Sequence, residues 1–358
     1  MKIGIDARLI EETGVGRYIR NLIHFLGIQD KENHYIVFLR KKSFDTFALP
    51  NNRWQKRLAD VKWHTVTEQF VMPWLLVKEH LDLVHVPYFN IPIFYPGKLV
   101  VTIHDLTILH VDTGKATTLP LPFYKLRRLG YYLVLSVGLI RAAHIIAVSQ
   151  TTKKEIMDHF HISPDKITVT YEGIERAKSE GKRLVKDPYF LYVGNVYPHK
   201  NAETLISAFR RMNGNVKLVF VGKEDYFYKR LKKTVANLSD RIIFFGQASD
   251  GELANLYHHA IALVFSSLME GFGLPALEAL ANGCPVICSD IPVFHEIVGE
   301  YAMYFNPNNT EDLHQKLEQV FKTRPNQKNM RPLLQRFNWA TMAQETLRVY
   351  KDAIGSSI

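Results

Sequence analysis

Two acidic residues flank a glycine-rich turn in the second half of this 358-residue chain. Gly271 and Gly273 allow a ligand to approach the backbone closely, and Pro275 fits the first position of a following helix. The positive N-terminal end of a helix attracts an anion such as a phosphate. Glu270 before the helix and Glu278 in its first turn can therefore hold two hydroxyl-bearing parts of one phosphorylated ligand.

Three further groups have residue types suited to binding or catalysis. Lys200, near the start of a predicted helix, is a cation that can bind a phosphate. His104 and Asp105 directly follow an apolar run, so they are expected at the carboxyl end of a strand, where ligands bind in open α/β sheets. Gly14 and Gly16 follow the first apolar run and resemble a phosphate-binding turn, but the full dinucleotide pattern is incomplete.

The elements that position these residues are short apolar runs separated by stretches of crossover length. Their β-branched composition predicts parallel strands in two doubly wound sheets. The runs are 2–5, 35–39, 83–86, 99–103, 144–148 and 167–170, then 190–193, 216–221, 242–245, 262–265, 285–288 and 303–305. A polar stretch divides the two series, and Asn338 can cap a last helix with one apolar face.

The amino-acid composition indicates which class of protein this chain belongs to. The chain is 47% hydrophobic and 22% charged, which predicts a folded globular protein without long disordered tracts. The N-terminus lacks the apolar core of a signal peptide, and the longest uncharged apolar stretch, 129–140, is too short to span a bilayer. Two cysteines, Cys284 and Cys288, are expected to be buried free thiols, as in a cytoplasmic protein.

The net charge of +10 predicts a phosphate-bearing partner. Charge alone does not decide whether this partner is a nucleic acid, a lipid or a diphosphate substrate. Segment 123–143 mixes basic and apolar residues and fits either a helix on an anionic membrane or one packed on the N-terminal sheet. Nucleic-acid binding lacks any supporting motif. No histidine has metal-ligand spacing, so no metal site is expected.

The segment from Glu270 to Glu278 resembles the E-x7-E signature of family 4 glycosyltransferases, which are retaining enzymes of the GT-B fold. Further motifs that resemble the family run along nearly the whole chain in the same order. They are Asp6-Ala7-Arg8, Gly14-Val15-Gly16-Arg17-Tyr18, His104-Asp105-Leu106, Ala147-Val148-Ser149, Gly194-Asn195, Pro198-His199-Lys200-Asn201, Ser289-Asp290 with Pro292 and Glu296, and Phe337-Asn338-Trp339. The opening motifs look most like bacterial polysaccharide mannosyltransferases.

The resemblance implies two Rossmann-like domains that face a cleft. Residues 1–172 would form an N-terminal acceptor-side domain and 188–336 a C-terminal nucleotide-sugar-binding domain, joined by a linker at 173–187. Residues 337–358 would form a helix that packs back on the N-terminal domain.

The resemblance also implies roles for individual residues. Glu270 would hold hydroxyls of the donor sugar, Glu278 the ribose hydroxyls, and Lys200 the diphosphate. His104 would approach the transferred sugar through its carbonyl or ring, while Asp105 orients the loop or meets the acceptor. The remaining donor-site residues contribute mainly backbone groups. They are Gly14, Gly16, Gly222, Gly246, Gly271, Phe272, Gly273 and Leu274.

Asn195 departs from the family pattern, because many members carry an arginine there that also meets the diphosphate. His199, Arg17 or the turn at residues 14–16 could compensate, and the sequence does not decide between them. We expect Asn195 to belong to the donor site nonetheless.

The expected reaction transfers a hexosyl group, with mannosyl as the first candidate, from a nucleoside diphosphate sugar to a glycan or lipid-linked glycan hydroxyl. GDP-mannose is the first candidate donor, a substrate rather than a cofactor, and no metal is required. The expected location is the cytoplasm, with peripheral contact at the inner face of the membrane. A sugar-nucleotide epimerase of the same fold is the nearest alternative.

Overall fold

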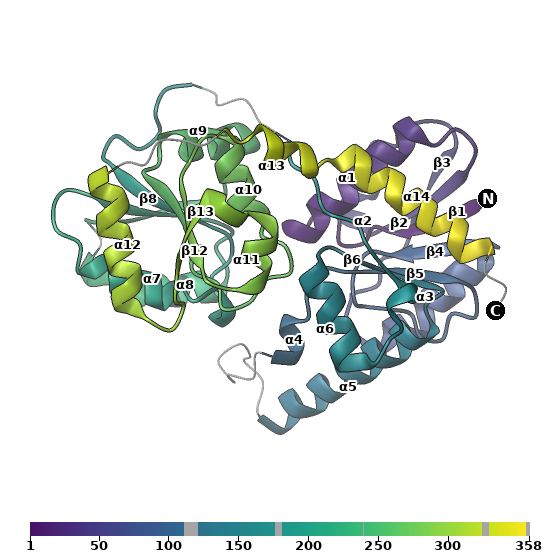
Figure 1. Cartoon of the computed structure of the whole chain (residues 1–358). Coiled ribbons are helices and arrows are strands. Elements are labelled where there is room, and N and C mark those ends of the chain that lie inside the picture. The colour runs from purple at the N-terminus through teal and green to yellow at the C-terminus, as the bar shows by residue number, and fades with distance from the viewer. Residues whose placement is uncertain (111–120, 176–180, 239, 324–328, 356–358) are drawn as a thin grey trace. The chain divides into compact units, whose positions relative to one another are not determined.

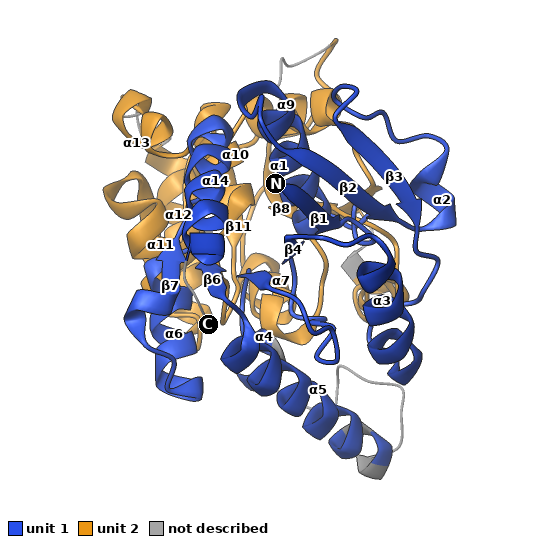
Figure 2. Cartoon of the chain, turned by 90° about the vertical axis from the view of Figure 1, so that its right-hand side faces the viewer, with its two compact units in different colours: residues 1–110, 119–173, 338–358 blue, residues 111–118, 174–337 orange. Residues whose placement is uncertain are grey.

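The computed structural model describes residues 1–110, 121–175, 181–238, 240–323 and 329–355. These residues divide into two compact units (Figures 1 and 2). Unit 1 contains residues 1–110, 121–173 and the stretch from Asn338 onwards, and unit 2 contains the described residues of 174–337. Each unit is an α/β domain with its own sheet.

Unit 1 is built on seven parallel strands in the order β3-β2-β1-β4-β5-β6-β7. The strands are β1 (Lys2–Asp6), β2 (His34–Leu39), β3 (Trp54–Leu58), β4 (Leu83–Val86), β5 (Leu99–Ile103), β6 (His144–Ala147) and β7 (Ile167–Val169). The helices are α1 (Gly14–Gln29), α2 (Lys41–Phe44), α3 (Val66–Lys78), α4 (Thr107–His110), α5 (Leu121–Arg141), α6 (Gln150–Phe160) and α14 (Trp339–Gly355), with a 3₁₀ turn η1 (Pro164–Lys166). The strand order reverses between β1 and β4.

The sheet of unit 1 is buried on both faces, because successive side chains of a strand point to opposite sides. On one face, Val84 and Val101 share a core with Met72 of α3. On the other face, His85 bonds through Nδ1 to the Tyr350 hydroxyl of α14, at 2.6 Å. Helix α14 also packs along α1. The last helix of the chain therefore returns to the N-terminal unit, as the GT-B fold class predicts.

Unit 2 has six parallel strands in the order β10-β9-β8-β11-β12-β13. The strands are β8 (Tyr189–Val193), β9 (Lys217–Val221), β10 (Ile242–Gly246), β11 (Ala262–Phe265), β12 (Val286–Ser289) and β13 (Ala302–Phe305). The helices are α7 (Ala202–Arg210), α8 (Tyr226–Thr234), α9 (Asp250–His259), α10 (Leu274–Ala281), α11 (Pro292–Ile297), α12 (Thr310–Thr323) and α13 (Arg331–Arg336), with 3₁₀ turns η2 (Pro198–Lys200), η3 (Ala236–Leu238) and η4 (Gly299–Tyr301). Here the order reverses between β8 and β11.

The prediction of two doubly wound parallel sheets is confirmed. Every predicted strand is present, with ends that differ by a residue or less. Strand β3 was not predicted from the sequence; it is an edge strand on which Gln55 is exposed and Lys56 and Arg57 are half-buried. Part of the predicted linker, residues 176–180, lies outside the described residues. The two cysteines are buried and free, and burial raises the pKa of Cys284 to about 12.

Candidate functional site

The loops that follow β8 and β11 carry Lys200 and Glu270 to the carboxyl edge of the sheet of unit 2. These two strands are hydrogen-bonded neighbours at the point where the strand order reverses, which is where doubly wound sheets bind ligands. The amide of Leu268 donates to the carbonyl of His199 at 2.8 Å, and Ser266 Oγ donates to the carbonyl of Lys200 at 2.9 Å. The two loops are thus joined by one backbone–backbone bond and one side-chain–backbone bond.

The turn that presents Lys200 has a local sequence cause. Pro198 begins a 3₁₀ turn, and Asn201 ends it in a left-handed conformation with φ of 54°. Asparagine tolerates this conformation better than most residues. The Asn201 side-chain amide donates to the Pro307 carbonyl at 3.0 Å, which fixes the turn against a second loop of unit 2.

Lys200 and Glu270 form a direct ion pair, with 2.5 Å between Nζ and Oε1. Their side chains are 17% and 11% exposed, so water screens this pair less than a surface pair. Ser267 Oγ also donates to Oε1 of Glu270, at 2.6 Å. Within the described part of the chain, Oε2 of Glu270 has no hydrogen bond, so it can accept one from a ligand hydroxyl.

The glycine-rich turn after Glu270 is held by aromatic packing. Gly273 has φ of 97°, and a Cβ there would lie 2.8 Å from Cε1 of Phe294, so a larger residue would be strained and crowded. The Phe272 ring is buried against Phe337, at 5.6 Å between centroids. The side chain of Phe272 therefore belongs to the core, and its ligand contacts are restricted to the backbone.

Two details of the predicted helix were wrong. Helix α10 begins at Leu274, so Pro275 is its second residue and Glu278 its fifth, beyond the first turn. The helix starts one residue earlier because Gly273 in the left-handed region serves as its N-cap. The predicted glycine cap at the other end is confirmed, since Gly283 has φ of 76°.

Glu278 is 7% exposed and accepts a hydrogen bond at 3.0 Å from the hydroxyl of Tyr257. Tyr257 lies on α9, which packs beside α10. This bond orients the carboxylate from within the unit. Tyr257 was not predicted as a site residue, because no local pattern in the sequence indicates that a tyrosine 21 residues away is a partner of Glu278.

Two of the predicted donor-site glycines meet a third glycine at the carboxyl ends of three adjacent strands. The Gly222 amide donates to the Gly246 carbonyl at 2.9 Å, and the Gly194 amide donates to the Val221 carbonyl at 2.9 Å. A Cβ on Gly222 would lie 2.3 Å from the carbonyl oxygen of Gly194. Only glycine fits this approach of two backbones, which leaves backbone groups as the contacts for a ligand.

Asn195 lies in the same loop as Lys200, directly after the Gly194 turn. Its carbonyl accepts from the Tyr192 hydroxyl at 2.5 Å, and its side-chain oxygen accepts from the Tyr197 amide at 3.4 Å. Asn195 therefore helps to shape the loop that carries Lys200. Of its two bonds, the one to the Tyr197 amide needs the asparagine side chain, and an arginine could not accept it.

His104 follows β5 in unit 1, and protein atoms already bind both of its ring nitrogens. Nδ1 lies 2.9 Å from Oε1 of Glu172, and Nε2 lies 3.1 Å from the carbonyl oxygen of Pro87. The Tyr18 ring contacts the imidazole edge-on, at 4.8 Å between centroids. The ring is thus fixed, whereas the main-chain carbonyl of His104 accepts only a long hydrogen bond, at 3.5 Å from the Thr152 hydroxyl, among the contacts of the described residues. The carbonyl is therefore the more available ligand contact of His104. Glu172, buried after β7, was not identified from the sequence.

Asp105 accepts a hydrogen bond from the Thr107 amide at 2.9 Å. It thereby stabilises the start of α4 and orients the loop, as one of its two predicted roles requires.

Gly14 and Gly16 lie inside the first turn of α1 rather than in a turn before it. A Cβ on Gly16 would lie 2.5 Å from the carbonyl oxygen of Ile10, so its small size is needed for packing. Gly14 is exposed, and a Cβ there would meet no atom within 4 Å. Of the two, Gly14 retains the exposure that a phosphate contact needs.

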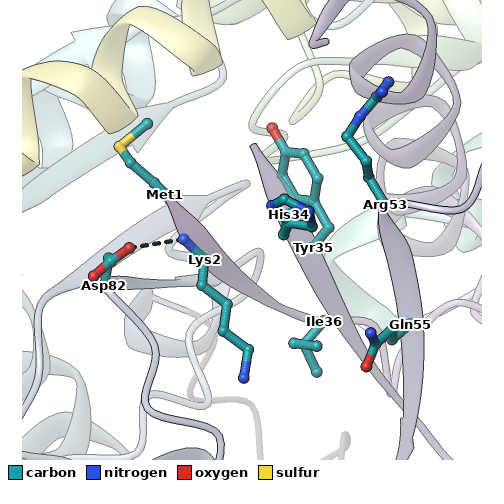
Figure 3. Close-up of a pocket in the computed structure, with 8 residues that line it drawn as sticks. All are labelled: Met1, Lys2, His34, Tyr35, Ile36, Arg53, Gln55 and Asp82. Atoms are coloured by element: carbon teal, nitrogen blue, oxygen red, sulfur yellow. Dashed lines mark hydrogen bonds between the residues drawn. The ribbon is translucent and has the colours of Figure 1, made fainter. Parts of the chain in front are cut away.

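A hollow of about 380 Å³ lies at the amino edge of the unit 1 sheet, where β1, β2 and β3 begin (Figure 3). It is lined by Met1, Lys2, His34, Tyr35, Ile36, Arg53, Gln55 and Asp82. None of the predicted site residues lines it. Because doubly wound sheets bind ligands at their carboxyl edges, this hollow is separate from the candidate site.

A metal-binding cluster and a membrane-spanning helix are both absent from the described residues. Within them, no group of three or more His, Cys, Asp or Glu side chains is placed to hold a metal ion. No helix in the described ranges has the length and apolarity needed to cross a bilayer.

Several solved structures share this fold. Sucrose-phosphate synthase from Thermosynechococcus elongatus has a TM-score of 0.81 and 20% identity, over 100% of both chains. HepE from Anabaena, in complex with UDP and glucose, has a TM-score of 0.76 and 16% identity, over 98% of this chain and 99% of that chain. Together with the two doubly wound units, these likenesses define the fold class as GT-B.

Two sequence families match the chain. They are Glycosyltransferase Family 4, over residues 13–178, and Glycosyl transferases group 1, over residues 174–333. The O-antigen chain mannosyltransferase RfbU of Salmonella typhimurium is 30% identical over 270 residues, which cover 74% of this chain and 72% of that protein. The chain belongs to the family 4 glycosyltransferases and is a hexosyl-transferring enzyme.

Proposed function

We propose that this enzyme transfers a mannosyl group, with retention, from GDP-mannose to a hydroxyl of a glycan or lipid-linked glycan. The observation that carries the proposal is the Lys200–Glu270 ion pair, which lies where the strand order of unit 2 reverses between β8 and β11. Similarity to an O-antigen mannosyltransferase supports the choice of mannose. HepE was solved with UDP and glucose, so the test of the donor must include uridine and thymidine nucleotides.

The pair suits a nucleoside diphosphate sugar because its two charges match two parts of that ligand. Oε2 of Glu270 can accept a hydrogen bond from a sugar hydroxyl. Lys200 can turn from the carboxylate to the diphosphate, whose negative charge grows as the bond to the sugar breaks. Backbone groups at Gly222 and Gly246 and in the turn at residues 271–274 are left to contact the nucleotide.

In the proposed reaction, the bond between the anomeric carbon and the diphosphate oxygen breaks and a bond to the acceptor oxygen forms on the same face. The departing phosphate oxygen takes the proton of the acceptor hydroxyl, and the nucleoside diphosphate leaves. No protein nucleophile is required. The fixed imidazole of His104 keeps its main-chain carbonyl in place beside the loop of Asp105.

The proposed donor is tested by thermal shift with GDP-, UDP- and dTDP-sugars. GDP-mannose should raise the melting temperature most, and the shift should persist in EDTA because no metal is required. A larger shift with a UDP-sugar, or a shift lost in EDTA, contradicts the proposed donor or its metal independence.

The reaction is tested by incubating labelled GDP-mannose with and without an acceptor. Label should enter a glycan only when acceptor is present, and the donor sugar should remain mannose. Isomerised donor in the absence of acceptor would support an epimerase instead.

Peripheral contact with an anionic membrane at its cytoplasmic face completes the proposal. The N-terminal half of α5 supports it, since its described positions from Phe123 to Leu133 are mostly exposed and include Lys125, Arg127 and Arg128. Its C-terminal half instead buries Leu135 and Leu139 in the core.

A further inference from the structure

Two polar side chains lie in the core of unit 1, on strands that are otherwise apolar. His85 of β4 and Thr102 of β5 are both fully buried, whereas the other residues of these two strands are leucine, valine and isoleucine. A buried polar group destabilises a core unless it is hydrogen-bonded, and the proposed reaction uses neither side chain. The groups around His85 and Thr102 show what the two side chains hold in place.

A chain of hydrogen bonds joins this pair to α14 and α1. The Tyr350 hydroxyl of α14 lies 2.6 Å from Nδ1 of His85, and Nε2 of His85 lies 2.7 Å from Oγ1 of Thr102. Oγ1 of Thr102 in turn lies 3.1 Å from the hydroxyl of Tyr18, on α1. Both tyrosines are also fully buried. The chain thus runs from the last helix of the protein, across β4 and β5, to the first helix.

The direction of the chain follows from its end at Tyr18. The Tyr18 hydroxyl is also hydrogen-bonded to that of Thr346, which itself donates to a backbone carbonyl of α14 at 2.8 Å. Thr346 therefore accepts from Tyr18, and Tyr18 accepts from Thr102. Thr102 in turn accepts from Nε2–H of His85, whose Nδ1 accepts from Tyr350. Every member is satisfied when His85 is neutral, and burial keeps it neutral by lowering its pKa to about 3.

Tyr18 also contacts His104, a residue of the candidate site. Thr102 and His104 are two positions apart, so their side chains project from the same face of the sheet. Tyr18 spans both of them. Its hydroxyl bonds to Thr102, and its ring meets the His104 imidazole edge-on, at 4.8 Å between centroids. An edge-on contact depends on the orientation of both rings, and the hydrogen bond to Thr102 fixes the orientation of Tyr18.

Tyr18 is the last residue of the motif that begins at Gly14. Gly14 is exposed and lies about one helical turn before Tyr18, in the first turn of α1. Anchoring Tyr18 through its hydroxyl therefore also fixes the position of this first turn. Tyr18 is thus placed to hold two predicted site elements of unit 1, which are the loop of His104 and the start of α1.

We propose that Tyr18 is a positioning residue for sugar transfer, and that α14 holds it in place through the buried hydrogen-bond chain. Tyr18 contacts the His104 ring, while Glu172 and the Pro87 carbonyl bind the two ring nitrogens. Together these contacts fix the imidazole, which keeps the main-chain carbonyl of His104 in place for the transferred sugar. The inference rests on the proposed function for the identity of the reaction, whereas the hold on His104 is a feature of unit 1 alone.

Two conservative variants break the chain and preserve the shape of the core. Y18F removes the hydroxyl but keeps the ring, and T102V removes the hydroxyl between Tyr18 and His85. Each should lower kcat for transfer to an alkyl mannoside about fivefold, with donor KM within about twofold of the wild type. The matched control is Y189F, which removes a buried hydroxyl that donates to the Leu256 carbonyl at 2.7 Å in unit 2. Y189F should keep the kcat of the wild type.

A double variant tests whether Tyr18 and Glu172 act through the same imidazole. If both hold His104, kcat of Y18F/E172Q should stay close to that of the less active single variant, because contacts on one ring are coupled. Losses that multiply would mean that Tyr18 acts elsewhere, and a Y18F kcat equal to that of the wild type would mean that its hydroxyl is not needed. Either result overturns the proposal.

Nitrogen-15 NMR of the histidine rings reports on the same contact without an assay of activity. The His104 signals, identified by their loss in His104→Gln, should shift or broaden in Y18F and T102V and stay unchanged in Y189F. Unchanged His104 signals in Y18F overturn the proposed hold, whatever the kinetics show. If the wild type transfers mannose to no acceptor, the proposed function fails, and these signals still decide whether Tyr18 positions His104.

Discussion

Replacing Lys200 by alanine tests whether its ion pair with Glu270 serves the departing diphosphate or only the fold. At 2.5 Å and an effective dielectric constant of about 20, the attraction between the two charges is roughly 7 kcal/mol before desolvation. Desolvation of two side chains that are 17% and 11% exposed offsets most of it. We expect the free energy of unfolding to fall by about 1–3 kcal/mol, between the values for surface and buried pairs.

The expected effect of Lys200→Ala on catalysis is larger than its effect on stability. Loss of one fixed cation at the departing diphosphate removes about 3–4 kcal/mol of transition-state stabilisation, or roughly 10²–10³ in kcat/KM. The assay measures transfer of labelled mannose at several donor concentrations, at a temperature well below the melting point of the variant. Unfolding then contributes nothing to the loss of rate.

Arg211→Ala is the matched control in the same unit. Arg211 pairs with Glu311, but the two side chains are 54% and 52% exposed. Removing an exposed pair costs about 0–1 kcal/mol and should leave kcat/KM unchanged. If Lys200→Ala lowers stability yet keeps kcat/KM within about threefold of the wild type, the pair is structural only and the assignment of Lys200 to the diphosphate is refuted.

Three further changes probe other parts of the two units. Glu172→Gln weakens the hold on His104 and should lower kcat about tenfold with little change in donor KM; unchanged kcat would mean that this hydrogen bond is not needed. Gly222→Ala places a Cβ 2.3 Å from the Gly194 carbonyl oxygen and should weaken GDP-mannose binding at least tenfold by calorimetry, whereas wild-type affinity would show that the loops give way freely. Burial lowers the pKa of His85 to about 3, whereas a histidine in the unfolded chain has a pKa of about 6.5. Between these two pH values only the unfolded chain takes up the proton, so the free energy of unfolding should fall by about 2 kcal/mol between pH 7 and pH 5. His85→Asn should therefore reduce the fall in urea-unfolding free energy between pH 7 and pH 5, and an undiminished fall would contradict this account.

The sheets could be predicted from the sequence because parallel strands buried on both faces appear as continuous apolar runs. β3 could not, because its edge position leaves polar residues such as Gln55 and Lys56 on the strand, and these break the apolar pattern. The same reasoning explains the placement of His104, since a polar residue directly after an apolar run must lie at the carboxyl end of its strand.

The partners of the site residues depend on tertiary packing, which local patterns do not encode. Glu172 reaches His104 across 68 residues of sequence, and Tyr257 reaches Glu278 from a neighbouring helix. For Gly16 the local pattern predicted a role that the structure does not show. Its position near the start of a helix indicated a phosphate site, but in the structure Gly16 packs against the backbone of Ile10. A glycine can serve a ligand or a close packing contact, and only the neighbouring atoms distinguish them.

The direct pairing of Lys200 with Glu270 has a consequence for how a donor enters. Without a donor, each charge neutralises the other, so neither is left unpaired in a position that is less than a fifth exposed. A nucleoside diphosphate sugar brings both a replacement anion for Lys200 and hydroxyls for Glu270, so the two side chains can separate without an uncompensated charge. A free sugar brings only hydroxyls and a free diphosphate only charge, and each would leave one member of the pair without its partner. If the proposed function holds, we therefore expect the pair to favour the intact donor over either a free sugar or a free diphosphate.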